Sequence, residues 1–202
     1  MYSAMLNLED SRVTIIGGGK VAYRKACLLV QERSEIQVIA PAFIEAFKDL
    51  GQRINKVYKN YEEGDCVESN LVFAATDDRL LNEAVGLYCK RARILCNVVD
   101  HVALSSFSTP AQFKRGDLII SISTGGNSPF LAAKIKEDLA NRYDETYEVY
   151  VQLLGQLREK VLQNEVDEIK KKEILNHMVT LNFEELKSYA KYICNRYASI
   201  SS

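Results

Sequence analysis

A glycine-rich turn between an apolar segment and an amphipathic one, at residues 12–25, constrains the fold more than any other feature of the sequence. The segment reads RVTIIGGGKVAYRK, and residues 13–16 have the composition of a short buried strand. Its pattern G-x-G-x-x-A places Gly17 at a tight turn, Gly19 where the backbone can approach a pyrophosphate, and Ala22 where a helix packs on a sheet. The start of that helix, at Lys20, favours a phosphate. The segment therefore predicts a dinucleotide site, with a purely structural turn as the alternative.

Apolar and amphipathic segments alternate from residue 12 to residue 99. The nearly continuous run of apolar residues at 70–75 is typical of a parallel strand that is covered on both faces of the sheet. A helix is expected after it, with Asp77 or Asp78 as its N-cap. The expected strands are residues 13–16, 35–39, 56–58, 70–75 and 94–99, and the expected helices are residues 20–31, 43–50 and 80–91. This alternation predicts a Rossmann-type α/β unit with a parallel sheet.

The pattern changes after residue 100. We expect a turn at residues 113–117, a half-buried strand at 118–123, a second glycine turn at 124–129 and a helix at 130–142. Residues 147–163 and 170–196 are charged and helical in character, without Gly or Pro to interrupt them after Gly155. The sequence thus predicts a Rossmann-type parallel sheet, a strand-helix region and an α-helical C-terminal domain. The expected boundaries are 1–112, 113–143 and 144–202.

The composition excludes several classes of protein. A formal net charge of −1 gives no reason to expect nucleic-acid binding, and no apolar run is long enough to cross a membrane. The first residues lack the pattern of a signal peptide. The 5 cysteines are scattered without a C-x-x-C pair, and there are only 2 histidines. We therefore expect reduced thiols in a cytoplasmic protein and no metal site.

The end of the second expected strand lacks the acidic residue that many dinucleotide sites use. Such a residue lies about 20 positions after the glycines and binds the ribose hydroxyls. Here Ala40 and Pro41 occupy this place, with no arginine that would favour a 2′-phosphate. This position therefore does not indicate which dinucleotide cofactor binds. Pro41 and Ala42 are left to contact an adenosine through backbone groups.

Polar residues follow two other expected strands. Thr76 comes after the run at 70–75, and Asp100 follows the strand at 94–99. Ligands of open α/β sheets bind beyond the carboxyl ends of the strands. Asp100 is therefore a candidate general acid or base if partial burial raises its pKa, and a turn cap without chemistry otherwise. His101 is either a group that titrates near neutral pH or a solvated loop residue.

Four cations flank the second glycine turn, and they have two interpretations. Charge-assisted hydrogen bonds to carboxylates are strong, so the set can hold a polycarboxylate. A solvated helix face is the alternative. The four residues are Lys114, Arg115, Lys134 and Lys136.

Four short motifs occur together in the order GGGKVAYRK, FAATDD, NVVD and STGGNSP. In this combination the chain resembles the precorrin-2 dehydrogenase family, which includes the N-terminal module of siroheme synthase, over most of residues 1–140. The resemblance implies NAD-dependent oxidation of precorrin-2 to sirohydrochlorin, on the way to siroheme or cobalamin. It also implies a homodimer, with the segment after the Rossmann unit making much of the interface, so that residues 113–143 are a dimerisation region.

The resemblance also assigns residues, motif by motif. Asp100 matches the family's key carboxylate, the proposed base, and Thr124 matches a position that carries serine in some relatives. The implied NAD-binding residues are Gly17, Gly18, Gly19, Lys20, Val21, Pro41, Ala42, Ala75 and Thr76. The implied tetrapyrrole-binding residues are Lys114, Arg115, Thr124, Asn127, Ser128 and Lys134.

Other functions stay open from the sequence. Some family members also insert iron into sirohydrochlorin, but this chain has His101 where members often have a second Asp. A role for paired carboxylates in iron insertion is therefore in doubt. A non-catalytic dinucleotide sensor and a tetrapyrrole carrier without catalysis are the two remaining alternatives. A sensor would have no reason to keep STGGNSP beside NVVD.

Overall fold

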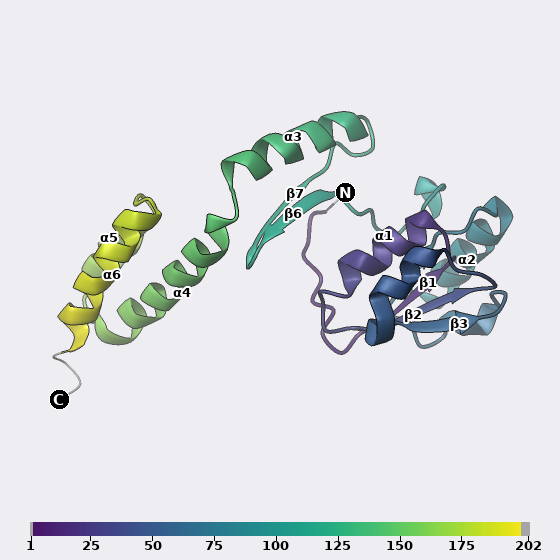
Figure 1. Ribbon diagram of the computed structural model, residues 1–202, viewed down its shortest axis with the longest axis horizontal. Coiled ribbons are helices and arrows are strands. Elements are labelled where there is room, and N and C mark those ends of the chain that lie inside the picture. Colours follow the sequence, from purple (N-terminus) through teal and green to yellow (C-terminus); the bar gives the residue numbers. More distant parts are fainter. Residues whose placement is uncertain (1, 199–202) are drawn as a thin grey trace. The chain divides into compact units, whose positions relative to one another are not determined.

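The chain forms two compact units in a computed structural model that describes residues 2–198. One unit ends at Thr109 and the other begins at Pro110 (Figure 1). The finer boundaries expected at 112/113 and 143/144 stay a prediction.

The first unit is built on a five-stranded parallel sheet with the strand order β3-β2-β1-β4-β5. Figure 1 labels the strands β1, β2 and β3 of this sheet. Ile15 in the central strand pairs with Val38 on one side and with Phe73 on the other. Because the order reverses between β1 and β4, a crevice is expected beyond the carboxyl ends of these two strands. The strands are β1 (Arg12–Ile16), β2 (Glu35–Ala40), β3 (Asn55–Tyr58), β4 (Leu71–Ala74) and β5 (Leu95–Val98). The predicted Rossmann-type sheet is confirmed.

Helices cover both faces of this sheet, which explains the continuous apolar runs in its strands. α1 (Lys20–Leu29) and the 3₁₀ helix η1 (Glu45–Arg53) pack on one face, around the fully buried Phe47. α2 (Arg79–Ala92) packs on the other face, around Val85 and Cys89. Two shorter 3₁₀ helices complete the unit, η2 (Glu63–Cys66) and η3 (Val102–Leu104).

The second unit contains a hairpin and four helices. β6 (Ala111–Arg115) and β7 (Leu118–Ile122) form an antiparallel pair, against which α3 (Pro129–Arg142) packs. α4 (Thr146–Asn164), α5 (Glu168–Met178) and α6 (Phe183–Ala198) surround a core that includes Val161, Met178, Leu186 and Ile193. Within residues 2–198, no helix is both long enough and apolar enough to cross a membrane.

Several local predictions were wrong. The helix expected at 43–50 is present as the 3₁₀ helix η1, but it begins at Glu45, extends to Arg53 and is interrupted by Gly51, which has a φ of 54°. The turn expected at 113–117 is mostly strand, because residues 113–115 belong to β6 and only 116–117 form the turn. The continuous helix expected at 170–196 is broken between Met178 and Phe183.

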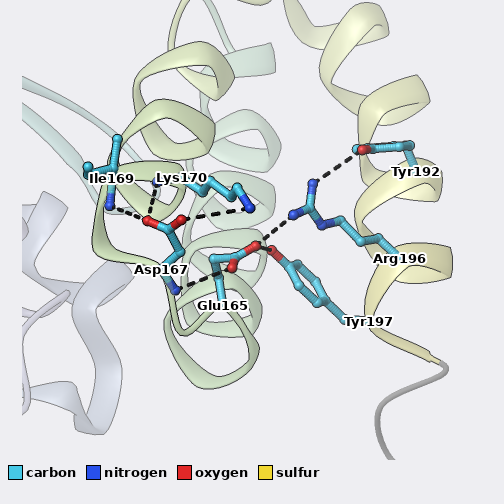
Figure 2. A network of polar contacts seen from close by, with 7 residues as sticks. All are labelled: Glu165, Asp167, Ile169, Lys170, Tyr192, Arg196 and Tyr197. Carbon is cyan, nitrogen blue, oxygen red and sulfur yellow. Dashed lines mark hydrogen bonds and ion pairs between the residues drawn. The ribbon is translucent and has the colours of Figure 1, made fainter.

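A polar network fixes the connection between α4 and α5 to the last helix (Figure 2). Arg196 Nη2 lies 2.7 Å from Glu165 Oε2, and the Tyr197 hydroxyl donates to the same oxygen at 3.1 Å. Burial alone would raise the pKa of Glu165, but the hydrogen bond from Tyr197 and the charge of Arg196 outweigh it and hold the pKa below its usual value. Asp167 caps α5 by accepting from the Ile169 N–H at 2.9 Å. The lowered pKa of Glu165 means that its charged form stabilises the helical unit at pH values above the usual glutamate pKa, and that this contribution is lost in acid.

Candidate functional site

The glycine turn is held between the ends of β2 and β4. Gly17 has a φ of +125°, and a Cβ there would overlap the carbonyl oxygen of Ala75. A Cβ on Gly18 would overlap the carbonyl oxygen of Ala42. The Ile44 N–H also donates to the Gly18 carbonyl at 3.0 Å. Backbone therefore approaches the turn from both sides, and only glycine fits at these two positions.

Gly19 differs from its two neighbours because nothing lies within 4 Å of a Cβ placed on it. It is the N-cap of α1, has no side chain that could cap the helix, and is followed by no acidic residue in the first turn. The first helical hydrogen bond runs from the Tyr23 N–H to the Gly19 carbonyl at 3.0 Å. The helix therefore does not use the N–H groups of Lys20 and Val21. Open space beside positively polarised N–H groups fits the pyrophosphate of a dinucleotide.

The remaining predicted cofactor residues border the same turn. Ala75 is buried, and its N–H donates to the Ile16 carbonyl at 2.8 Å, which keeps the end of β4 beside the turn. Thr76 follows it and is half-buried, whereas Pro41 and Ala42 are exposed at the end of β2. The structure therefore brings together the predicted cofactor residues of β1, β2 and β4 at one edge of the sheet.

Asp100 lies just beyond β5, and its side chain is exposed in this unit. Its Oδ1 accepts a hydrogen bond of 3.3 Å from Nδ2 of Asn82. Asn82 lies in the first turn of α2 and also bonds to Thr76. The backbone N–H of His101 donates to the Val98 carbonyl at 3.2 Å, which closes a tight turn after the strand. The sequence did not indicate Asn82 as a site residue.

Two of the predicted cations of the second unit, Arg115 and Lys134, are engaged with carboxylates of the chain itself. Arg115 lies 3.3 Å from Glu145, and Lys134 lies 2.8 Å from Asp138, one helical turn away. Lys114 is exposed on β6. A polycarboxylate would therefore compete with partners that two of these cations already have.

The second glycine turn is an ordered start for α3. The Thr124 hydroxyl accepts from the Ser128 N–H at 3.0 Å, and the Asn127 side chain donates to the Thr124 carbonyl at 3.1 Å. Ser128 in turn caps α3 by accepting from the Leu131 N–H at 3.3 Å. These predicted residues therefore form one local structure. Within residues 2–198, no group of three His, Cys, Asp or Glu side chains is arranged to hold a metal ion.

The sequence of the chain is similar to sequences of known families. Residues 4–111 match a family model described as putative NAD(P)-binding, and residues 115–142 match one described as sirohaem biosynthesis protein central. The chain is 34% identical to the precorrin-2 dehydrogenase of Priestia megaterium over 183 residues, which is 89% of each protein. The chain belongs to the precorrin-2 dehydrogenase family.

Other members of the precorrin-2 dehydrogenase family support the assignment. A solved structure described as SirC, precorrin-2 dehydrogenase, superimposes with a TM-score of 0.78 at 30% identity, covering 96% of this chain and 98% of the other. The siroheme synthase of Pseudomonas fluorescens strain SBW25 is 36% identical over 157 residues. The chain spans 34% of that protein's length. The family resemblance predicted from the motifs is confirmed.

Proposed function

We propose that this chain catalyses the NAD-dependent oxidation of precorrin-2 to sirohydrochlorin in siroheme biosynthesis. The observation that carries the proposal is the similarity to a precorrin-2 dehydrogenase across nearly the whole length of both proteins. The glycine turn supports it independently, because its third glycine leaves open space beside an uncapped helix start. The chain is thus an oxidoreductase, and NAD is its cofactor.

The glycine turn would hold the cofactor mainly through backbone groups. The N–H groups that follow Gly19 would bind the pyrophosphate, and Pro41 with Ala42 would border the adenosine. Ala75 and Thr76 would lie on the nicotinamide side. When bound, NAD supplies the acceptor for a hydride. No carboxylate at the end of β2 is needed in this arrangement.

Asp100 is the residue we assign to proton transfer. Oxidation of precorrin-2 removes two hydrogen atoms, of which one leaves with both electrons as a hydride to NAD and the other leaves as a proton. Asp100 lies at the strand end next to the proposed nicotinamide side, and its carboxylate would take that proton. Its exposure within the unit leaves it accessible to a macrocycle.

The substrate carries many carboxylates, so we assign its binding to polar and cationic side chains of the second unit. Arg115 and Lys134 would exchange their present partners, Glu145 and Asp138, for peripheral carboxylates of the tetrapyrrole. The remaining residues of this assignment are Lys114, Thr124, Asn127 and Ser128.

A homodimer is also part of the proposal. A two-stranded hairpin is marginally stable alone, and the first turn of α3 beside it exposes 90% of Phe130. A second copy of the chain would cover this surface. We propose the cytoplasm as the compartment, because the 5 cysteines are free thiols.

An anaerobic assay with precorrin-2, in the presence and absence of NAD, tests the function. We expect NADH and the spectrum of sirohydrochlorin to appear only when NAD is present. Asp100→Ala should abolish most of this turnover, whereas His101→Ala, a neighbour with no assigned role, should retain it. Binding of NAD without turnover would instead indicate a sensor, and binding of the tetrapyrrole without turnover would indicate a carrier.

A further inference from the structure

Asn82 uses every hydrogen-bonding group of its side chain at the edge of the sheet where the site lies. Its Oδ1 accepts from the Thr76 N–H at 3.0 Å and from the Thr76 hydroxyl at 2.7 Å. Its Nδ2 donates to the Thr76 carbonyl at 3.0 Å and to Asp100 Oδ1 at 3.3 Å. A primary amide offers two acceptor and two donor sites, so this amide is saturated. The residue itself is fully buried.

The bonds to Thr76 determine which way the amide faces. A backbone N–H can only donate and a backbone carbonyl can only accept, so the Asn82 oxygen must face the first and the nitrogen the second. The remaining hydrogen on Nδ2 therefore points to Asp100. Oδ1 of Asp100 is consequently an acceptor, and Oδ2 is the oxygen left to take a proton.

Two neighbouring residues explain why Asn82 can reach both strand ends. Asp78 fixes the first turn of α2 by accepting from the N–H groups of Leu80 at 2.9 Å and Leu81 at 3.1 Å. Gly86 lies one turn after Asn82, and a Cβ there would come within 2.8 Å of Val98 in β5. The absence of a side chain at Gly86 thus lets α2 lie close to β5, the strand that precedes Asp100.

We infer that Asn82 is a positioning residue that holds the Asp100 carboxylate for proton transfer and joins it to the peptide of Thr76 at the next strand end. The inference rests on the proposed role of Asp100. It assigns Oδ2 of Asp100 as the proton-accepting atom. It also couples the carboxylate to the side of the site proposed for the nicotinamide, because one amide contacts both.

A purely structural role would have different consequences. The three bonds to Thr76 are sufficient to hold the loop after β4, and such a role would not involve Asp100. A double-mutant cycle separates the two roles. If Asn82 acts through Asp100, substituting Asn82 should have little further effect on kcat once Asp100 has been replaced.

The test compares kcat and KM for the wild type, Asn82→Asp, Asp100→Ala and the double variant, with precorrin-2 and NAD. Asn82→Asp keeps an acceptor for Thr76 and removes both donors of the amide, the one to Asp100 and the one to the Thr76 carbonyl. We expect kcat to fall about 10- to 100-fold, the range for a lost hydrogen bond to a charged group, with a smaller change in KM for NAD. In the Asp100→Ala background, the same substitution should change kcat by less than about 3-fold. Asn70→Asp, at the opposite end of β4, is the matched control and should leave kcat unchanged.

A second measurement does not need turnover or a substitution in the buried position. In a proton–nitrogen NMR spectrum of Asp100→Ala, the side-chain amide proton of Asn82 that bonds to Asp100 should change its proton chemical shift, whereas the proton bonded to Thr76 should keep its own. An unshifted pair would overturn the inference even if Asp100→Ala is inactive. An equal loss from Asn82→Asp in both backgrounds would overturn it as well. A fully active Asp100→Ala would remove the proposed role of Asp100 itself, and with it the inference.

Discussion

Replacing Gly18 by alanine should reveal the packing role of the glycine turn. A Cβ at this position would overlap the Ala42 carbonyl oxygen and lie 3.0 Å from the Ala42 carbonyl carbon and from the Ala40 Cβ. Because the obstacle is backbone, the turn must shift and strain its bond with the Ile44 N–H. Overpacking costs about 1–3 kcal/mol, and a lost hydrogen bond costs about 1 kcal/mol. We expect the free energy of unfolding of the first unit to fall by about 2–4 kcal/mol.

The same substitution at Gly19 is the matched control for packing and the test of ligand binding. Its φ of −88° and ψ of −172° suit alanine, and the added methyl group meets no heavy atom within 4 Å. We expect stability to change by less than about 0.5 kcal/mol. The methyl group would occupy the space proposed for the pyrophosphate, so the affinity for NAD should fall about 10-fold or more, equivalent to about 1.4 kcal/mol.

Circular dichroism melting and calorimetric titration with NAD measure the two effects separately. The loss of about 2–4 kcal/mol at Gly18 should lower the melting midpoint by about 8–16 °C, because 1 kcal/mol corresponds to about 4 °C in a unit of this size. A Gly19→Ala protein that melts as early as Gly18→Ala would contradict the packing argument. A Gly19→Ala protein that binds NAD as tightly as the wild type would contradict the proposed position of the pyrophosphate.

Three further outcomes follow from the described contacts. Asp78→Ala removes the N-cap of α2 and should cost about 1 kcal/mol, read as a lower urea midpoint with an unchanged slope. The pKa of Glu165 is lower in the folded chain than the usual glutamate value of 4.5, and this difference stabilises the fold at pH values above 4.5. The stabilisation is lost as the pH falls through the folded-state pKa of Glu165. Tyr197→Phe should reduce this loss when the free energy of unfolding is followed in an acid titration, and identical titration curves for the variant and the wild type would contradict this. The exposed Cys194 should react with a maleimide in the native protein, as peptide mass spectrometry can show. Three buried thiols should react only on unfolding: Cys66, Cys89 and Cys96.

The parallel sheet could be predicted because its central strands β1 and β4 are largely apolar and buried and because the turn after β1 carries glycine at sterically closed positions. The break in the C-terminal helical region was harder to predict, because neither glycine nor proline marks the break before α6. Asn182 and Glu185 make that break instead: the Asn182 N–H donates to Glu185 at 2.8 Å, and the Glu185 N–H donates to Asn182 at 3.0 Å. This reciprocal capping pattern, Asn-x-x-Glu, was the available signal.

The site was predictable where a residue acts through its local backbone, and less so where it acts through a distant partner. The ion pair of Lys134 with Asp138 follows from their spacing of four residues. The pair of Arg115 with Glu145 joins two elements and has no local signature. Asn82 falls between these cases, because it lies on the apolar face of its helix with Val85. A polar residue at such a position signals a buried partner without indicating which one.

Asp100 is exposed, yet the chain on both sides of it is anchored. Before it, the Val98 N–H donates to the Ser105 hydroxyl at 2.9 Å. After it, the chain turns back along β5, where the Cys96 N–H donates to the Ser106 hydroxyl at 2.8 Å and the Ser106 N–H donates to the Cys96 carbonyl at 2.8 Å. These serines bond to backbone groups on the outer edge of β5, which is the last strand of the sheet and pairs with β4 alone among the described strands. The same bonds hold the turn that presents Asp100, so protection of the sheet edge and placement of the carboxylate depend on one set of contacts.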